Sequence, residues 1–168
     1  MFEVGEYVMY GTYGVYSVTG IRNSPIDKND PRSFYELKPL RNGEGSKAFV
    51  PVGSDNVYLR RVMSREAAER FVGEQLGGAE VIEIPNERER KNIYRVAIGD
   101  HTPLSCARII RTVAQRRRQL SGTSRRLPDT DAEFEREAKN NLFGELSVAL
   151  GIPFEEVEEY ILERCGEA

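Results

Sequence analysis

The chain has 168 residues, of which 39% are hydrophobic and 30% are charged, a composition typical of a folded globular protein with one domain or two small ones. No apolar run approaches the roughly 18 residues that span a bilayer, and the acidic N-terminus lacks the basic region of a secretory signal. The two cysteines lie far apart in the sequence, which favours a reducing compartment. We therefore expect a cytoplasmic protein.

The net charge of −3 hides a strong segregation of charge along the chain. Residues 1–62 hold 8 Lys/Arg and 7 Asp/Glu, residues 63–128 hold 13 and 8, and residues 129–168 hold 3 and 12. Within 85–126 there are 11 basic residues and 3 acidic ones. This asymmetry favours a middle segment that faces a polyanion and an acidic end that faces solvent or a partner.

Residues 1–62 are expected to form an N-terminal domain of short strands. Runs rich in Val, Tyr, Phe and Ile predict five strands, which read VGEYVMY, VYSVTGI, SFYELKPL, KAFVPV and NVYLRRV. Turn signals separate them, namely GTYG, NSPIDKNDPR, RNGEGS and GSDN. Five strands with no room for helices predict a small SH3-like or Tudor-like β-barrel.

Tyrosines recur every third residue in the first hairpin, at Tyr7, Tyr10, Tyr13 and Tyr16. An aromatic ligand cage is one interpretation of this pattern. However, the alternation of a strand places Tyr7 and Tyr10 on opposite faces, so the four rings cannot all converge. We favour a tight hairpin in which some of the tyrosines join the core.

Residues 63–168 are expected to form an all-α domain of about five helices, so that the whole chain is an α+β protein. Capping residues and terminal glycines mark the ends of these helices. The predicted helices cover about 64–76, 86–98, 102–120, 130–150 and 154–164.

Apolar residues at helical spacing predict which face of each helix is buried. In the second helix the expected buried residues are Ile93, Val96 and Ala97. In the third helix they are Leu104, Ala107, Ile110, Val113 and Ala114. In the fourth helix they are Phe134, Ala138, Leu142, Leu146 and Ala149.

The sequence carries no recognisable catalytic or metal-binding constellation. His101 is the only histidine, and it follows Asp100 in a turn that precedes a helix. The HExxH, GxSxG and GxxxxGK[ST] motifs are absent. The carboxylates of the last helix form a run that a solvated face explains. We expect no enzymatic activity, no cofactor, no metal and no small-molecule substrate.

The basic middle segment predicts a nucleic-acid surface. At helical spacing Arg88, Lys91 and Arg95 share one side that avoids the predicted apolar stripe, so these side chains are expected to point outward. Arginine suits bidentate contact with phosphate. The residues expected to contact DNA are Arg88, Arg90, Lys91, Arg95, Arg116, Arg117, Arg118 and Arg125. The alternative is a solvated surface, or arginines that pair with the chain's own acidic end.

Four stretches, in this order, resemble the CarD/CdnL family of bacterial transcription regulators. FEVGEYVMYGTYGVYSVTGI resembles the family's RNA-polymerase-interacting module, which transcription-repair coupling factors share, with Glu6 for Asp and Gly11 for the usual Pro. KAFVPVGSDNVYLRRV is similar to the strand with a VP pair in that module. NERERKNIYRVAIGD resembles the family's basic helix, and EREAKNNLFGELSVALGI its late helix with the sequence G-E-L.

This resemblance implies a non-enzymatic regulator with two partners, RNA polymerase and promoter DNA. The barrel would dock on the polymerase β subunit by edge-strand pairing. The residues implied at that contact are Lys47, Phe49, Val50 and Pro51. The helical domain would reach the upstream edge of the melted bubble and stabilise the open complex, with Arg88 and Arg90 at positions that touch the DNA backbone.

Two departures from the family pattern concern the DNA contact. The family usually has a tryptophan just before the basic helix, where this chain has Pro85 or Asn86 and no tryptophan anywhere. The start of the fourth helix is often basic in the family, but here it reads DTDAEFERE. We therefore expect contact mainly with DNA phosphates and altered stabilisation of the bubble.

Two other functions remain open from the sequence. The first hairpin also resembles a KOW motif, which would indicate a small-barrel protein that binds RNA or the ribosome. The chain would instead be a protein-interaction adaptor without DNA contact if its arginines pair only with its own acidic residues.

Overall fold

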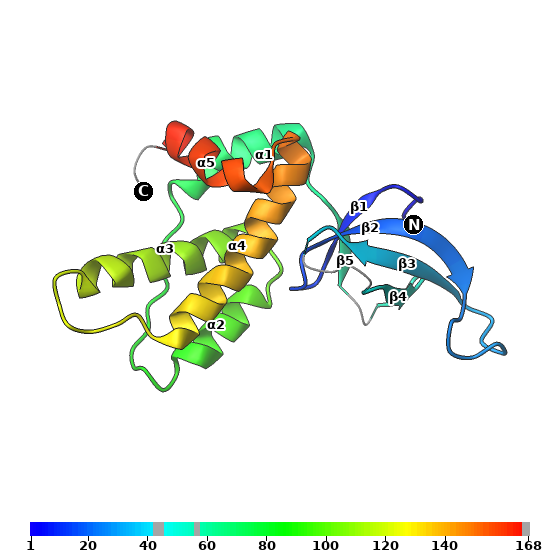
Figure 1. Ribbon diagram of the computed structural model, residues 1–168, viewed down its shortest axis with the longest axis horizontal. Coiled ribbons are helices and arrows are strands. Elements are labelled where there is room, and N and C mark those ends of the chain that lie inside the picture. The colour runs from blue at the N-terminus through cyan, green and yellow to red at the C-terminus, as the bar shows by residue number, and fades with distance from the viewer. Residues whose placement is uncertain (42–45, 56–57, 166–168) are drawn as a thin grey trace. The chain divides into compact units, whose positions relative to one another are not determined.

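The computed structural model describes residues 1–41, 46–55 and 58–165. The chain divides into two compact units, Met1–Val62 and Met63–Ala168, which are described separately (Figure 1). The described helices include none that is both long and apolar enough to cross a membrane.

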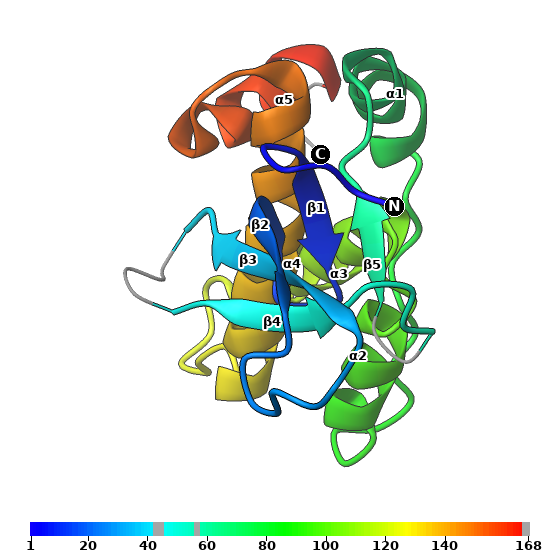
Figure 2. The same cartoon turned by 90° about the vertical axis from the view of Figure 1, so that its right-hand side faces the viewer.

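The first unit is a five-stranded antiparallel sheet with the strand order β4-β3-β2-β1-β5 (Figure 2). Its strands are β1 (Tyr7–Tyr10), β2 (Val15–Asn23), β3 (Ser33–Pro39), β4 (Ala48–Pro51) and β5 (Leu59–Arg61). All five predicted strands are therefore present. Most of the predicted turn at 41–46, and the junction at 56–57 before the fifth strand, lie outside the described residues.

The sheet is open, so the closure of a barrel that the strand count predicted is not shown. Within the described ranges, β4 pairs only with β3 and β5 pairs only with β1. These two strands have four and three residues, and they form opposite edges of the sheet. Each of them keeps one row of main-chain groups that no neighbouring strand uses.

The core of this unit lies on one face of the sheet and forms around Val8, Val18, Tyr35, Leu37 and Val50. Alternation along each strand brings these residues to the same side. The predicted separation of the tyrosines is confirmed in part. The ring of Tyr10 lies 5.0 Å from that of Tyr13 and 5.3 Å from that of Tyr16, whereas the side chain of Tyr7 is exposed.

The second unit is helical, and all five predicted helices are present in the described part of the chain. Their bounds are α1 (Arg65–Arg70), continued by the π-helical turn η1 (Phe71–Leu76), α2 (Arg90–Ile98), α3 (Pro103–Leu120), α4 (Asp129–Leu150), and the 3₁₀ turn η2 (Phe154–Glu156) that leads into α5 (Val157–Cys165). Ser64 and Thr102 cap α1 and α3, and Gly151 ends α4 with a φ of 68°.

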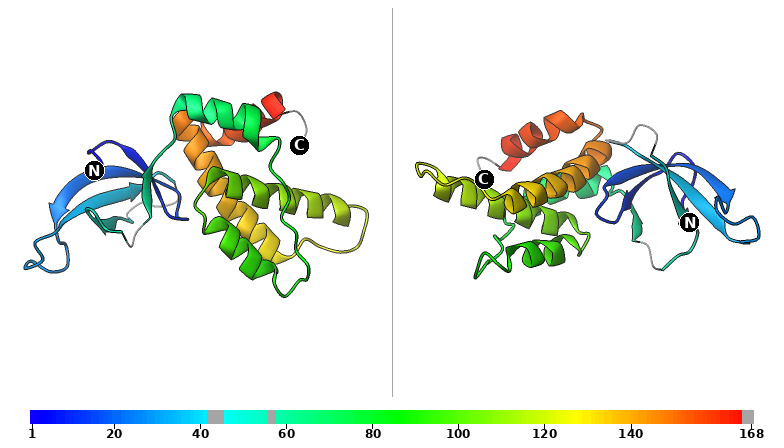
Figure 3. Two further views of the ribbon diagram at one scale, coloured as in Figure 1. Left: turned by 180° about the vertical axis from the view of Figure 1, so that it is seen from behind. Right: turned by 60° about the horizontal axis from the view of Figure 1, so that its bottom comes forward.

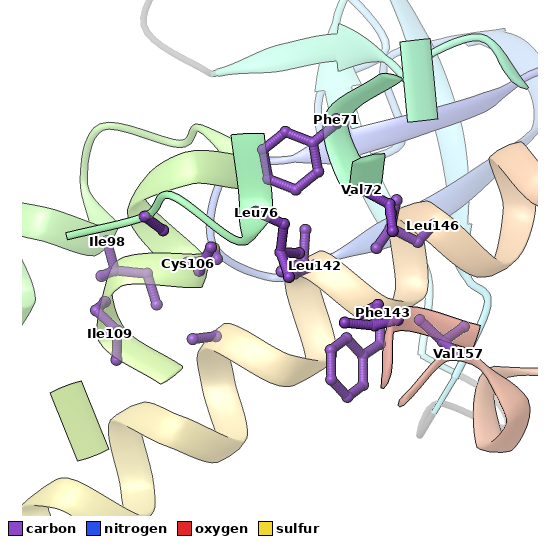
Figure 4. Close-up of a cluster of buried hydrophobic side chains, with 14 of the residues drawn as sticks. Phe71, Val72, Leu76, Ile98, Cys106, Ile109, Leu142, Phe143, Leu146 and Val157 are labelled. Carbon is purple, nitrogen blue, oxygen red and sulfur yellow. The ribbon is translucent and has the colours of Figure 1, made fainter. Parts of the chain in front are cut away.

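Helix α4 is the central element of this unit and packs against α1, α2, α3 and α5 (Figure 3). Its residues Phe134, Ala138, Leu142 and Leu146 are buried, which confirms the predicted face except for the half-buried Ala149. Leu142 lies beside Leu76 of η1 in the hydrophobic core (Figure 4).

The predicted buried face of α2 is confirmed only in part, because Ile93 and Ala97 are half-buried and Ala97 packs against the core. The buried residues are Arg90, Tyr94 and Ile98, whereas Val96 is 65% exposed. These buried positions recur every four residues and lie on one side of the helix. The sequence did not predict this row of residues as buried because its first member, Arg90, is charged.

The predicted buried face of α3 is confirmed in part, because Ala107 and Val113 are buried and Ile110 is half-buried against the core. Cys106, Ile109 and Thr112 are buried, whereas the side chain of Leu104 is exposed. Burial of Thr112 is compatible with its polarity because its hydroxyl accepts a hydrogen bond from the main-chain N–H of Ile82 and donates one to the carbonyl of Arg108.

Candidate functional site

Strand β4 presents a free main-chain edge. The N–H of Val52 donates to the carbonyl of Ser33 at 2.8 Å, so the main chain at Val52 and Val50 faces β3. Because these orientations alternate in an antiparallel pair, the main-chain groups of Phe49 and Pro51 point away from the sheet. Pro51 lacks an N–H and is compatible with such an edge position. The edge therefore offers the N–H and the carbonyl of Phe49, whereas the carbonyl of Pro51 accepts from the N–H of Ser54 at 3.3 Å.

The side chains of β4 divide between the two faces of the sheet. The side chain of Val50 is buried in the core and its main chain faces β3, so Val50, which was predicted at the polymerase contact, offers no group at the free edge. Phe49 is 38% exposed on the opposite face. A cavity of about 320 Å³ opens beside the end of the strand and is lined by Phe2, Pro51 and Leu59, among others.

The buried carboxylate of Glu36 forms ion pairs with two cationic side chains, those of Lys47 and Arg22. Glu36 of β3 is only 3% exposed and lies directly across from Phe49 in the register. Its carboxylate accepts from Lys47 Nζ at 2.6 Å, pairs with Arg22 Nε at 2.7 Å and accepts from Thr19 Oγ1 at 3.1 Å. The hydrogen bond from Lys47 is the main reason that the pKa of Glu36 is lowered. The ammonium group of Lys47 is therefore held beside β4 by a residue of its own sheet.

The stability of the first unit is expected to fall in acid through Glu36. Its folded-state pKa lies below the unfolded value, so the stabilisation is present above about pH 4.3 and is lost as the pH falls through the folded-state pKa. Urea denaturation of the full chain, followed by the NMR signals of β3, should show this loss below about pH 4. Glu36→Gln should flatten the profile, and Glu3→Gln, at an exposed carboxylate, should not. A profile unchanged by Glu36→Gln would contradict the assignment.

In the helical unit, Arg90, which was predicted to contact DNA, is instead part of a buried ionic cluster. Arg90 is 5% exposed, and its guanidinium donates to Asp131 Oδ1 at 2.8 Å and to both oxygens of Glu87. Asp131 of α4 is fully buried and also accepts from the hydroxyl of Tyr94 at 2.6 Å. We define the Asp131 cluster as Arg90, Tyr94, Asp131, Glu87 and Arg116.

The charges of the Asp131 cluster stabilise one another. Burial disfavours the charged form of Arg90, but the hydrogen bonds to Glu87 and the charge of Asp131 prevail and raise its pKa. Burial, assisted by Asp131, raises the pKa of Tyr94. Arg116 joins the cluster through Glu87 Oε1 at 2.6 Å and Asp131 Oδ2 at 3.5 Å. The cluster thus connects α2, α3 and α4.

The arginines at the end of α3 are less available for DNA contact than the sequence indicated. Arg117 forms a two-point ion pair with Glu135 of α4, and the hydrogen bonds in this pair raise the pKa of Arg117. Arg118 is exposed at the end of α3. Pairing within the chain therefore accounts for Arg116 and Arg117, as one of the alternatives from the sequence proposed.

Three predicted residues remain together on an exposed surface. Arg88 in the turn before α2, and Lys91 and Arg95 on α2, are exposed, and no residue in the described ranges forms an ion pair with them. We call these three residues the α2 basic face. The predicted Arg125 is exposed in the loop between α3 and α4. The α2 basic face has the charge and exposure that contact with phosphates requires.

No group of three or more His, Cys, Asp or Glu side chains arranged to hold a metal ion occurs among residues 1–41, 46–55 and 58–165. Cys106 is buried in the helical core, and Cys165 donates through Sγ to the carbonyl of Val72. Both thiols behave as small core groups.

Comparison with known proteins identifies the first unit. The family model described as CarD-like/TRCF RID domain matches residues 2–63. No curated protein sequence matches the chain at a significant level. The match covers the five-stranded sheet, including the free β4 edge. The N-terminal unit is therefore a CarD-like/TRCF RID domain, the RNA-polymerase-interacting module that its opening hairpin and VP strand resemble.

Proposed function

We propose that the chain is a transcription regulator that docks on the β subunit of RNA polymerase through the β4 edge of its RID domain and contacts promoter DNA through the α2 basic face. The free edge of β4 is the observation that carries this proposal, because it lies within the segment that matches the RID family. In this role the protein modulates the stability of the open complex and performs no catalysis.

Docking by strand addition fits the chemistry of the β4 edge. The N–H and the carbonyl of Phe49 supply hydrogen bonds to an extended segment of the partner, and these bonds give affinity. Specificity comes from neighbouring side chains, here the exposed ring of Phe49 and the ammonium group of Lys47. Co-purification of the full chain with RNA polymerase, and with an isolated β-subunit lobe, tests this step. Failure to bind the lobe would contradict it.

DNA contact in this proposal relies on phosphates rather than on bases. The α2 basic face presents three flexible cations beside the exposed, apolar Val96, and the chain has no tryptophan to insert into a base step. Docking on the polymerase raises the local concentration of this face near promoter DNA, so weak phosphate contacts suffice. Arg90, which is buried, supports the fold of this surface and does not take part in the contact.

Removing the α2 basic face is expected to weaken DNA binding in a salt-dependent way. The triple variant Arg88→Ala, Lys91→Ala and Arg95→Ala should reduce the slope of log affinity against log salt by about 3, since each phosphate contact contributes about 0.9. Fluorescence anisotropy with promoter DNA, at several salt concentrations, measures the slope. Arg136→Ala, at an exposed arginine of α4, is the control and should retain most of the slope.

The same salt titration distinguishes the proposed DNA contact from a second candidate function, a protein-interaction adaptor that does not contact DNA. Ion pairs within the chain favour this candidate, because Arg90, Arg116 and Arg117 all face carboxylates of the same unit. An adaptor predicts equal affinity and equal salt slope for the wild type and the triple variant. That result would contradict the proposed DNA contact and leave the docking on polymerase as the function.

A further inference from the structure

The cavity beside the end of β4 is lined by residues from both edge strands of the open sheet. Val50 and Pro51 of β4 and Leu59 of β5 line it together with Phe2 and Tyr35, and we call it the β4–β5 pocket. Its volume is about 320 Å³, whereas a cavity of about 150 Å³ accommodates a benzene ring. The pocket therefore has room for a long side chain.

The β4–β5 pocket is continuous with the edge at which the proposed partner strand docks. Strand β4 ends at Pro51, whose carbonyl accepts from the N–H of Ser54, and the turn that follows lines the pocket. The side chain of Val50 lies on the core face and also lines it. In an antiparallel pair, residues directly opposite each other have their side chains on the same face. A residue of the partner strand opposite Val50 therefore directs its side chain toward the pocket.

Asp55 gives the β4–β5 pocket a negative charge. It is the one charged side chain among the lining residues, and it is exposed. Among residues 1–41, 46–55 and 58–165, none forms an ion pair or a hydrogen bond with its carboxylate. The guanidinium of Arg61 lies 5.5 Å from the centre of the Phe2 ring, but it pairs with Glu6. The charge of the pocket therefore favours a cationic occupant.

The aromatic walls of the pocket suit an arginine in particular. The ring centres of Phe2 and Tyr35 lie 5.5 Å apart, and both residues line the pocket. A guanidinium group stacks on aromatic faces, while its methylene stem packs against apolar surface. The hydroxyl of Tyr35, a residue that is 3% exposed, accepts from the N–H of Phe2 at 3.0 Å. Because a hydroxyl oxygen has two lone pairs, it can also accept from a guanidinium.

We propose that the β4–β5 pocket binds an arginine side chain of the strand that docks on β4. The guanidinium pairs with Asp55, and the methylene stem lies against Phe2 and Leu59. This inference rests on the docking proposed above and adds to it a contact that selects the register of the partner strand. Since side chains alternate along a strand, a slip by one residue turns the arginine away from the pocket.

Strand peptides that bind the full chain test the pocket directly. The probes are three fluorescein-labelled peptides of about seven residues, in which threonine and valine alternate around a central arginine, citrulline or norleucine. Citrulline replaces the charged guanidinium with a neutral group of similar shape, and norleucine keeps only an apolar stem. In fluorescence anisotropy the arginine peptide should bind at least about fivefold more tightly than either of the others, because only its charge complements Asp55.

Two matched variants show whether this preference arises in the pocket. Asp55→Asn should reduce the preference for arginine to less than about twofold, because it removes the carboxylate that pairs with the guanidinium. Asp27→Asn, at an exposed carboxylate of the loop between β2 and β3, is the control and should retain the preference. Equal binding of the three peptides, binding of none, or a preference that Asp55→Asn retains would overturn the proposal.

Binding of the β-subunit lobe separates the failure of this inference from the failure of the proposed function. If the lobe binds to the wild type but the peptides show no preference for arginine, only the pocket assignment is overturned. If the preference depends on Asp55 but the lobe does not bind, the pocket is supported and docking on polymerase is overturned. Dimerisation of the free chain in sedimentation experiments, abolished by Phe49→Pro, would overturn the pocket assignment by showing that a second copy covers this edge.

Discussion

Replacing Asp131 with alanine is expected to lower the free energy of unfolding of the helical unit by about 3–5 kcal/mol. The fully buried carboxylate accepts hydrogen bonds from Arg90 and Tyr94, so its loss leaves the buried guanidinium of Arg90 with only Glu87 as an ionic partner and a buried hydroxyl without its acceptor. Urea denaturation of the full chain, followed by the helical circular dichroism signal, measures this change because α2, α3 and α4 all belong to this unit.

Asp129→Ala is the matched control for this variant. Asp129 is exposed in the first turn of the same helix, where a carboxylate contributes at most about 1 kcal/mol through the helix dipole. Replacing Arg90, Tyr94 and Asp131 together with apolar residues of similar size should restore much of the stability. A loss below about 1 kcal/mol for Asp131→Ala would contradict the role of the cluster.

The variant Phe49→Pro is expected to weaken binding to RNA polymerase about tenfold to hundredfold. Proline removes the N–H that points away from β3 and places a ring at the free edge, so a partner strand loses a hydrogen bond and meets a steric obstacle. The intrachain ladder is retained, because the main-chain groups of Val50 and Val52 that face β3 are untouched. A pull-down with the β-subunit lobe, or surface plasmon resonance with the same fragment, measures the change.

The opposite edge of the sheet supplies the control for this experiment. The carbonyl of Tyr58 and the N–H of Val62 face β1, so the main chain of Arg61 points to the free side of β5. Arg61→Pro therefore makes the same change on the other edge, and it also removes an exposed ion pair with Glu6. Docking through β4 predicts nearly unchanged binding for Arg61→Pro. Loss of binding in that variant, or its retention in Phe49→Pro, would place the contact elsewhere.

The elements of both units could be predicted because their signals are local. Ser64, Thr102 and Gly151 mark helix ends through hydrogen bonds and dihedral angles within a few residues. The start of α2 shows the limit of this reasoning. Asn86 caps a turn by accepting from the N–H of Glu89, but the regular helix begins only at Arg90. Whether the sheet closes into a barrel could not be predicted from the sequence either, because closure depends on whether its two edge strands meet in space.

The candidate surface was harder to predict because burial of a charge depends on distant partners. Arg88 and Arg90 looked equivalent in the sequence, yet one is exposed and the other is buried against Asp131, 41 residues further along the chain. The sequence did contain a sign of this burial. Asp131 stands three residues before Phe134 and seven before Ala138, so it lies on the apolar stripe of α4. An acid on a buried stripe indicates a buried cationic partner.

The lifetime of the open promoter complex is the measurement that tests the proposed function most directly. Polymerase and promoter DNA are combined with the wild type, with Phe49→Pro, or with the triple variant of Arg88, Lys91 and Arg95, and dissociation is followed after a competitor is added. The wild type should change the lifetime, and both variants should return it to that of polymerase alone. An unchanged lifetime with the wild type, or a change that both variants retain, would contradict a regulator that links the β4 edge to DNA through the α2 basic face.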